Sequence, residues 1–218
     1  LKLRGLGLIA FTAVALMQTP AHAELTIEIT GAGANQIPLA IADFGGEAGA
    51  SRALTSVIRG DLERSGLFKM IDTSGVSMTE ATSPQYGDWK LRGADALAAG
   101  SIGPTDGGRQ EARFRLYDIN KQASLAGAAF VTSTPMLRAA GHRIADVIYE
   151  KLTGIPGVFA TRIAYVVRTG ANRYELHIAD ADGQNAQAAL RSRAPFISPT
   201  WSPDGTRLAY VSFENKKP

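Results

Sequence analysis

The chain has 218 residues, enough for one large domain or two small ones, and its 45% hydrophobic and 20% charged content is typical of a globular protein rather than a disordered one. It has no cysteine, which excludes disulfide bonds, thiolate metal sites and a cysteine nucleophile. The formal net charge is +3, but no basic run interleaved with aromatic residues accompanies it, so we expect no nucleic-acid binding.

The first residues have the pattern of a targeting segment. Two basic residues precede an apolar run over residues 6–17, which is too short to span a bilayer. Ala21 and Ala23 then supply the small-x-small pattern that signal peptidase accepts. We therefore predict a signal peptide over residues 1–23, cleaved after Ala23, rather than an uncleaved membrane anchor. The mature chain that remains is close to neutral.

The mature chain opens with a predicted strand. Residues 24–30 alternate polar and apolar side chains, which is the period of a half-buried strand, and residues 37–42 form a second, apolar strand. Between them, Gly31-x-Gly33 lacks the third glycine of a dinucleotide-binding loop and precedes a strand instead of a helix. We expect no nucleotide site and no cofactor.

An amphipathic helix is predicted over residues 50–65. Its apolar side chains fall at helical spacing on one face, and Gly66 can take the left-handed conformation that ends a helix. The next predicted elements are a strand over residues 67–71, a loop over 73–87, a short helix over 88–92, and strands over 94–102, 111–117 and 124–131.

A second long helix follows these strands. Thr134 is its predicted N-cap, Pro135 occupies the first helical position, and Gly154 ends it. His142 falls near the start of this helix and has no partner motif, so we interpret it as a surface or cap-side polar residue rather than a catalytic one. These elements predict an α/β domain over residues 24–154, with a mixed sheet and two main helices.

After a linker over residues 155–158, the pattern becomes all-β and contains a repeat. The sequence RIAYV at residues 162–166 returns as RLAYV at 207–211, an offset of about 45 residues. The second copy follows a Trp-Ser-Pro-Asp-Gly-Thr turn over residues 201–206. Short strands with this period and Asp-Gly turns are typical of β-propeller blades. Residues 159–218 are therefore predicted to form the first one to two blades of an incomplete propeller.

The motifs of common enzyme classes are missing. The sequence has no His-x-x-x-His zinc pattern, no Gly-x-Ser-x-Gly nucleophile elbow and no phosphate loop. Asp180 and Asp182 flank Ala181 beside Gly183, and we interpret them as turn formers rather than calcium ligands, because the other oxygens of a calcium loop are absent. We predict no catalytic residue and no metal, and the chain looks like a binding module.

Several stretches closely resemble the TolB family, the periplasmic propeller proteins of the Tol-Pal system in Gram-negative bacteria. They are AGHRIAD at residues 140–146, YEKLTGI at 149–155, TRIAYV at 161–166, YEL at 174–176, ADADG at 179–183 and SPTWSPDG at 198–205. The resemblance implies a monomeric, non-catalytic periplasmic protein with an α/β domain and a six-bladed propeller. It also implies roles in outer-membrane constriction during cell division and in envelope integrity.

The same resemblance implies partners. In that family the propeller binds the lipoprotein Pal at a site that colicins exploit for import, and the mature N-terminal segment binds the inner-membrane protein TolA. By position, the TolA segment corresponds to Glu24, Leu25, Thr26, Ile27, Glu28 and Ile29. The Pal surface is expected mostly in blades beyond Pro218, so no Pal-contacting residue is assigned.

Two other function classes are compatible with a propeller. One is a periplasmic hydrolase, such as a peptidase, whose catalytic part lies outside these residues and would contain a Gly-x-Ser-x-Gly elbow. The other is a polysaccharide-binding or polysaccharide-degrading propeller, for which more aromatic surface is expected than 7% aromatic residues provide.

Overall fold

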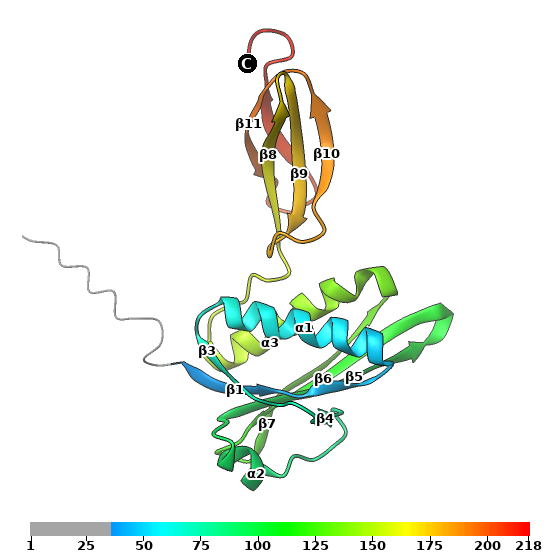
Figure 1. Ribbon diagram of the computed structural model, residues 1–218, viewed down its shortest axis with the longest axis vertical. Coiled ribbons are helices and arrows are strands. Elements are labelled where there is room, and N and C mark those ends of the chain that lie inside the picture. The colour runs from blue at the N-terminus through cyan, green and yellow to red at the C-terminus, as the bar shows by residue number, and fades with distance from the viewer. Residues whose placement is uncertain (1–35) are drawn as a thin grey trace, which may run out of the picture. The chain divides into compact units, whose positions relative to one another are not determined.

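The computed structural model describes residues 36–218 (Figure 1). The predicted signal peptide, with Ala21 and Ala23, and the predicted partner-binding segment from Glu24 to Ile29 lie outside the described residues. The described part contains an α/β domain and, after it, a set of antiparallel strands, so the predicted fold class is confirmed.

The α/β domain is built on a mixed sheet of seven strands. β1, β2, β3 and β4 join the sheet in parallel, in the order β3-β1-β5-β2-β4, while β6 pairs antiparallel with β5 and β7 pairs antiparallel with β6. β2 was not predicted, and β4 lies in the predicted loop over residues 73–87. The strands are β1 (Ile37–Ile41), β2 (Asp43–Gly46), β3 (Phe68–Ile71), β4 (Ser77–Met78), β5 (Ala96–Thr105), β6 (Arg109–Asp118) and β7 (Ala123–Thr132).

Two long helices cover one face of this sheet and a short one covers the other (Figure 1): α1 (Ala48–Arg64), α2 (Tyr86–Leu91) and α3 (Leu137–Thr153). α1 begins where the Glu47 carboxylate accepts the N–H groups of Gly49 and Ala50 at 2.8 Å each. The N–H of Gly154, whose φ of 76° is left-handed, donates to the Glu150 carbonyl and ends α3 as predicted.

The predicted start of α3 was wrong by two residues. Thr134–Met136, which contain Pro135, form a separate 3-10 turn (η2), and the α-helix begins at Leu137 with no side-chain cap. The tighter turn is closed by the Met136 N–H, which donates to the Ser133 carbonyl at 2.8 Å. Thr134 is therefore not the cap. A second 3-10 turn, η1 (Asp106–Gly108), connects β5 to β6.

Both faces of the sheet are buried, as a sheet with parallel strands requires. Leu39 and Ile41 of β1 point to the side of α1 and α3, whereas Ala40 and Ala42 point to the opposite side, where Trp89 of α2 is 4% exposed. The larger core lies under the two long helices and includes Leu54, Ile58, Leu62, Phe114, Leu116, Ile144 and Ile148.

α1 and α3 approach each other closely at Gly141. A Cβ atom placed on Gly141 would lie 2.9 Å from Val57 Cγ1 and 3.4 Å from the Leu54 carbonyl oxygen. A residue larger than glycine therefore cannot occupy this position unless the helices move apart.

The linker after α3 is bonded back to the helix. Asp146 accepts the N–H groups of Phe159 at 2.7 Å and Ala160 at 3.1 Å, and a Cβ on Gly157 would lie 2.6 Å from the Asp146 Cα. Burial raises the pKa of Asp146, although the two N–H donors act in the opposite direction. The path of the chain after α3 is thus fixed by the Asp146 carboxylate and by the lack of a side chain at Gly157.

The remaining strands form two antiparallel sheets. β8 (Arg162–Gly170), β9 (Arg173–Asp180) and β10 (Gln187–Ser192) make the first, and β11 (Phe196–Trp201) and β12 (Leu208–Ser212) make the second. The two copies of the repeated sequence lie in β8 and β12. β10 and β11 were not predicted, because only the strands with the most continuous apolar sequence gave a signal.

The turn before β12 contacts the first copy of the repeat. The Arg162 guanidinium donates to the Gly205 carbonyl at 2.7 Å and lies 4.8 Å from the centre of the Trp201 ring, a cation–π contact. Within the turn, the Asp204 carboxylate accepts from the Ser202 hydroxyl at 2.5 Å and from the Thr206 hydroxyl at 2.8 Å. The Trp-Ser-Pro-Asp-Gly-Thr sequence therefore both closes its own turn and packs on β8.

None of the helices in residues 36–218 has the length and apolar character needed to cross a membrane.

Replacing Gly141 by alanine is expected to lower the free energy of unfolding by about 1–2 kcal/mol, because overpacking against Val57 outweighs the gain in helix propensity. Urea unfolding followed by circular dichroism measures this. Gly87→Ala is the matched control, since a Cβ on that helical glycine meets nothing within 4 Å. An unchanged or higher free energy for Gly141→Ala would contradict the close approach.

Hydrogen bonds from Ser202 and Thr206 hold the pKa of Asp204 at about 2, below its ordinary value of 3.8. The turn's stabilisation by this carboxylate is therefore present above pH 3.8 and is lost as the pH falls through about 2. Carbon-detected NMR titration of the carboxyl group measures the value. Thr206→Val should raise the pKa and Thr206→Ser should not; equal pKa values in the two variants would show that the hydroxyl is not involved.

Candidate functional site

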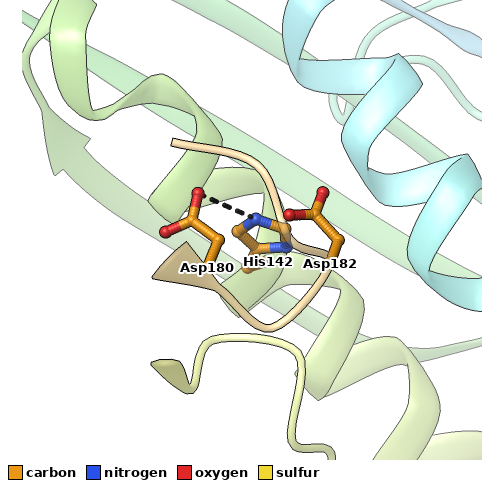
Figure 2. A group of neighbouring side chains, drawn as sticks. All are labelled: His142, Asp180 and Asp182. Atoms are coloured by element: carbon orange, nitrogen blue, oxygen red, sulfur yellow. Dashed lines mark ion pairs between the residues drawn. The ribbon is translucent and has the colours of Figure 1, made fainter. Parts of the chain in front are cut away.

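A cluster of charged, hydrogen-bonded and largely buried side chains lies where the β9–β10 turn meets α1 and α3. We call this group the junction cluster and define it as Asp61, Arg64, Arg138, His142, Asp180 and Asp182. Figure 2 shows His142 between the two carboxylates of the turn. The sequence pattern singles out His142, Asp180 and Asp182 but gives no sign that they lie together.

His142 is buried, which corrects the prediction of a surface or cap-side residue. The residue is 2% exposed, and its Nδ1 lies 2.6 Å from the Oδ2 of Asp61, which is 1% exposed. The close crossing at Gly141 explains this, because it presses the first turns of α3 onto α1 and covers the imidazole. Asp61 was missed because an acid on a helix is usually solvated.

The β9–β10 turn reaches the helices through Asp182. Its carboxylate pairs with the guanidinium of Arg138, and the Arg64 guanidinium lies 3.7 Å away. The same carboxylate accepts the Gln184 N–H at 3.0 Å, the bond of an Asx turn, so its interpretation as a turn former agrees with the geometry. Burial works against its charge, but this N–H and Arg138 lower the pKa of Asp182.

Asp180 faces the other side of the imidazole. One of its oxygens, Oδ2, lies 3.8 Å from His142 Nε2 (Figure 2). The same oxygen lies 3.6 Å from Arg138 Nε and accepts from the Asn185 amide at 2.7 Å. His142 Nε2 is fully buried and has no hydrogen-bond partner in the described part of the chain. Burial alone would lower the pKa of His142, but the hydrogen bond and charge of Asp61 raise it.

The cluster is a poor metal site despite its residue types. Donor atoms of His142, Asp180 and Asp182 lie within 4.8 Å of one another, a spacing that a metal ion could bridge. However, the Arg138 guanidinium already pairs with Asp182 and approaches Asp180, so a divalent cation would have to displace it. We assign no metal ligand and no cofactor-binding residue in the described residues.

The chain matches two family models along its length. Residues 25–125 match the TolB amino-terminal domain, and residues 149–218 match the TolB beta propeller domain. The first match ends within β7, and the second begins within α3 and continues through the strands after it.

Curated relatives are named as Tol-Pal system proteins. The chain is 62% identical over 198 residues to the Tol-Pal system protein TolB of Dechloromonas aromatica (strain RCB), covering 91% of this chain and 46% of that protein. It is 55% identical over 218 residues to the Tol-Pal system protein TolB of Bordetella avium (strain 197N), covering 100% of this chain and 49% of that protein. The chain thus spans about half the length of the curated relatives that it matches.

A solved structure has a similar fold. The crystal structure of TolB from Acinetobacter baumannii matches with a TM-score of 0.73 and 39% identity, covering 87% of this chain and 47% of that chain. Two domain models, high identity and a shared fold agree on one conclusion. The chain belongs to the TolB family.

Proposed function

We propose that this chain is part of a non-catalytic periplasmic scaffold of the Tol-Pal system, exported with a cleaved signal peptide. The observation that carries the proposal is its 62% identity to a Tol-Pal system protein, together with matches to both TolB domain models. In this role it links inner-membrane TolA to the outer-membrane lipoprotein Pal. The link maintains envelope integrity and helps the outer membrane to constrict during cell division, and colicins use it for import.

The buried histidine supports a scaffold rather than an enzyme. A catalytic imidazole must reach a substrate or a nucleophile, whereas His142 is 2% exposed and its Nδ1 is bonded to Asp61. His177, the other histidine in the described residues, pairs with Glu175 at 2.8 Å and stacks on Tyr165. Neither imidazole is hydrogen-bonded to a serine hydroxyl in the described residues. Both histidines therefore have structural partners.

The TolA-binding segment is proposed at residues 24–29, with its boundaries set by the predicted cleavage after Ala23. Leu25, Ile27 and Ile29 would share one face of an extended strand, which suits addition of that strand to an exposed sheet edge of the partner. In this mode the backbone N–H and C=O groups supply affinity, and the alternating apolar side chains supply specificity. Pal is proposed to bind the propeller.

Removing residues 24–29 is expected to abolish TolA binding, as measured by isothermal titration calorimetry with the chain starting at Glu24 as the reference. Ile27→Pro should weaken binding at least about tenfold, because proline cannot donate a backbone hydrogen bond to the partner strand. Ile27→Val is the matched control and should bind like the reference. Unchanged affinity after the deletion would disprove the assignment of the segment.

A Pal pull-down tests the other half of the link. Because the Pal surface is expected mostly in blades beyond Pro218, the pull-down uses the protein with its complete propeller. This protein should retain Pal after removal of residues 24–29 if the propeller alone binds it, so loss of both partners would contradict two separate sites. Circular dichroism of the same variant shows whether the fold is intact.

A further inference from the structure

The junction cluster contains one more negative than positive charge if His142 is neutral. Asp61, Asp180 and Asp182 supply three carboxylates, and Arg64 and Arg138 supply two guanidinium groups. Asp61 and Asp182 are mostly buried, with side chains 2% and 8% exposed, so an uncompensated charge there is costly. One additional positive charge would balance the group.

The surroundings of the two ring nitrogens of His142 indicate that the imidazole carries this positive charge. The Asp61 carboxylate can only accept, so Nδ1, 2.6 Å away, must carry a proton. In a neutral imidazole, Nε2 would then present a lone pair toward the Asp180 Oδ2, 3.8 Å away, with no donor available to it. In an imidazolium, Nε2 carries a proton that points at this carboxylate. The geometry therefore fits the doubly protonated ring.

We infer that His142 is a proton-binding site that holds the β9–β10 turn on α1 and α3, so that this docking weakens when the imidazole loses its Nε2 proton. The turn belongs to the first sheet of the propeller segment, and both helices belong to the α/β domain. Protonation of one side chain thus couples pH to the contact between these elements. This inference does not depend on the partners proposed above.

The direction of the pH effect follows from linkage. Burial alone would lower the pKa of His142, but Asp61 on α1 raises it above the ordinary value of 6.5, and docking of the turn adds the charge of Asp182, which raises it further. The docked form therefore takes up a proton that the undocked form releases. Docking is therefore most favoured at a pH below the pKa of the undocked imidazole and weakens as the pH rises through the higher pKa of the docked imidazole.

All charged groups around the ring enter this balance. On α1, the negative charge of Asp61 favours the imidazolium and the positive charge of Arg64 opposes it. On α3, Arg138 opposes the imidazolium, and Asp146, one helical turn further along, favours it. On the turn, Asp180 and Asp182 favour it. Only the last two are removed when the turn leaves, and their loss makes the proton easier to release.

The first experiment measures the titration directly. The chain has three histidines, so proton–carbon NMR of the imidazole Cε1 groups resolves each of them, and His142→Gln assigns the relevant resonance. We expect a His142 pKa above 6.5 that falls in Asp180→Asn, which removes the carboxylate facing Nε2. Asp106→Asn makes the same charge change in the β5–β6 turn and should leave the value unchanged. A His142 pKa at or below 6.5 would overturn the inference.

The second experiment measures docking. Because the chain has no cysteine, Lys151→Cys and Arg193→Cys place two spin labels on exposed positions of α3 and the propeller segment. Double electron–electron resonance should give one distance at pH 5.5 and a broader, longer distribution at pH 9. His142→Gln should show the same distribution at both pH values, whereas His177→Gln should keep the pH dependence.

Three results would overturn the inference: identical distributions of the parent protein at both pH values, pH dependence that persists in His142→Gln, or pH dependence that disappears in His177→Gln. If His142→Gln does not fold, the titration of His142 in the parent protein and the distances measured in the parent protein at the two pH values still test the inference. Neither TolA nor Pal is present in these measurements, so their outcome is independent of the proposed scaffold function.

Discussion

The close crossing of α1 and α3 at Gly141 determines most of the arrangement described above. The glycine lets the two helices approach until Val57 fills the space of a side chain, and this contact brings Asp61 of one helix to His142 of the other. The same crossing covers the larger core between the two helices and the sheet, where Leu54 and Ile144 are completely buried. Packing and the polar cluster are therefore consequences of one small residue.

The fold could be predicted where residue patterns are local. Helical stripes and glycine stops located α1 and the end of α3. Alternation located β6, and the turn after it located β7, each to within two residues at both ends. β2 and β4 were missed because Asp43–Gly46 and Ser77–Met78 are short and lack an apolar run, so neighbouring strands define them rather than their own sequence. The repeat located the propeller strands, although only three of five were recognised.

The site was harder to predict because its members come from distant parts of the sequence. Asp61 and His142 are 81 residues apart, and Arg138 and Asp182 are 44 residues apart. Nothing in the local pattern pairs them, since an isolated acid or histidine on a helix is usually solvated. The one available signal was spacing: Arg138, His142 and Asp146 recur every fourth residue, which places three ionisable groups in a row on one face of α3.

That row also sets the register of the propeller segment along the helix. Its first two members face the β9–β10 turn, and its third binds the linker through Phe159 and Ala160. A displacement of the turn by one helical turn, about 5.4 Å, would bring Asp182 opposite His142 and leave Arg138 without its carboxylate. Arg138, His142 and Asp146 together therefore fix the position of the segment that follows along α3.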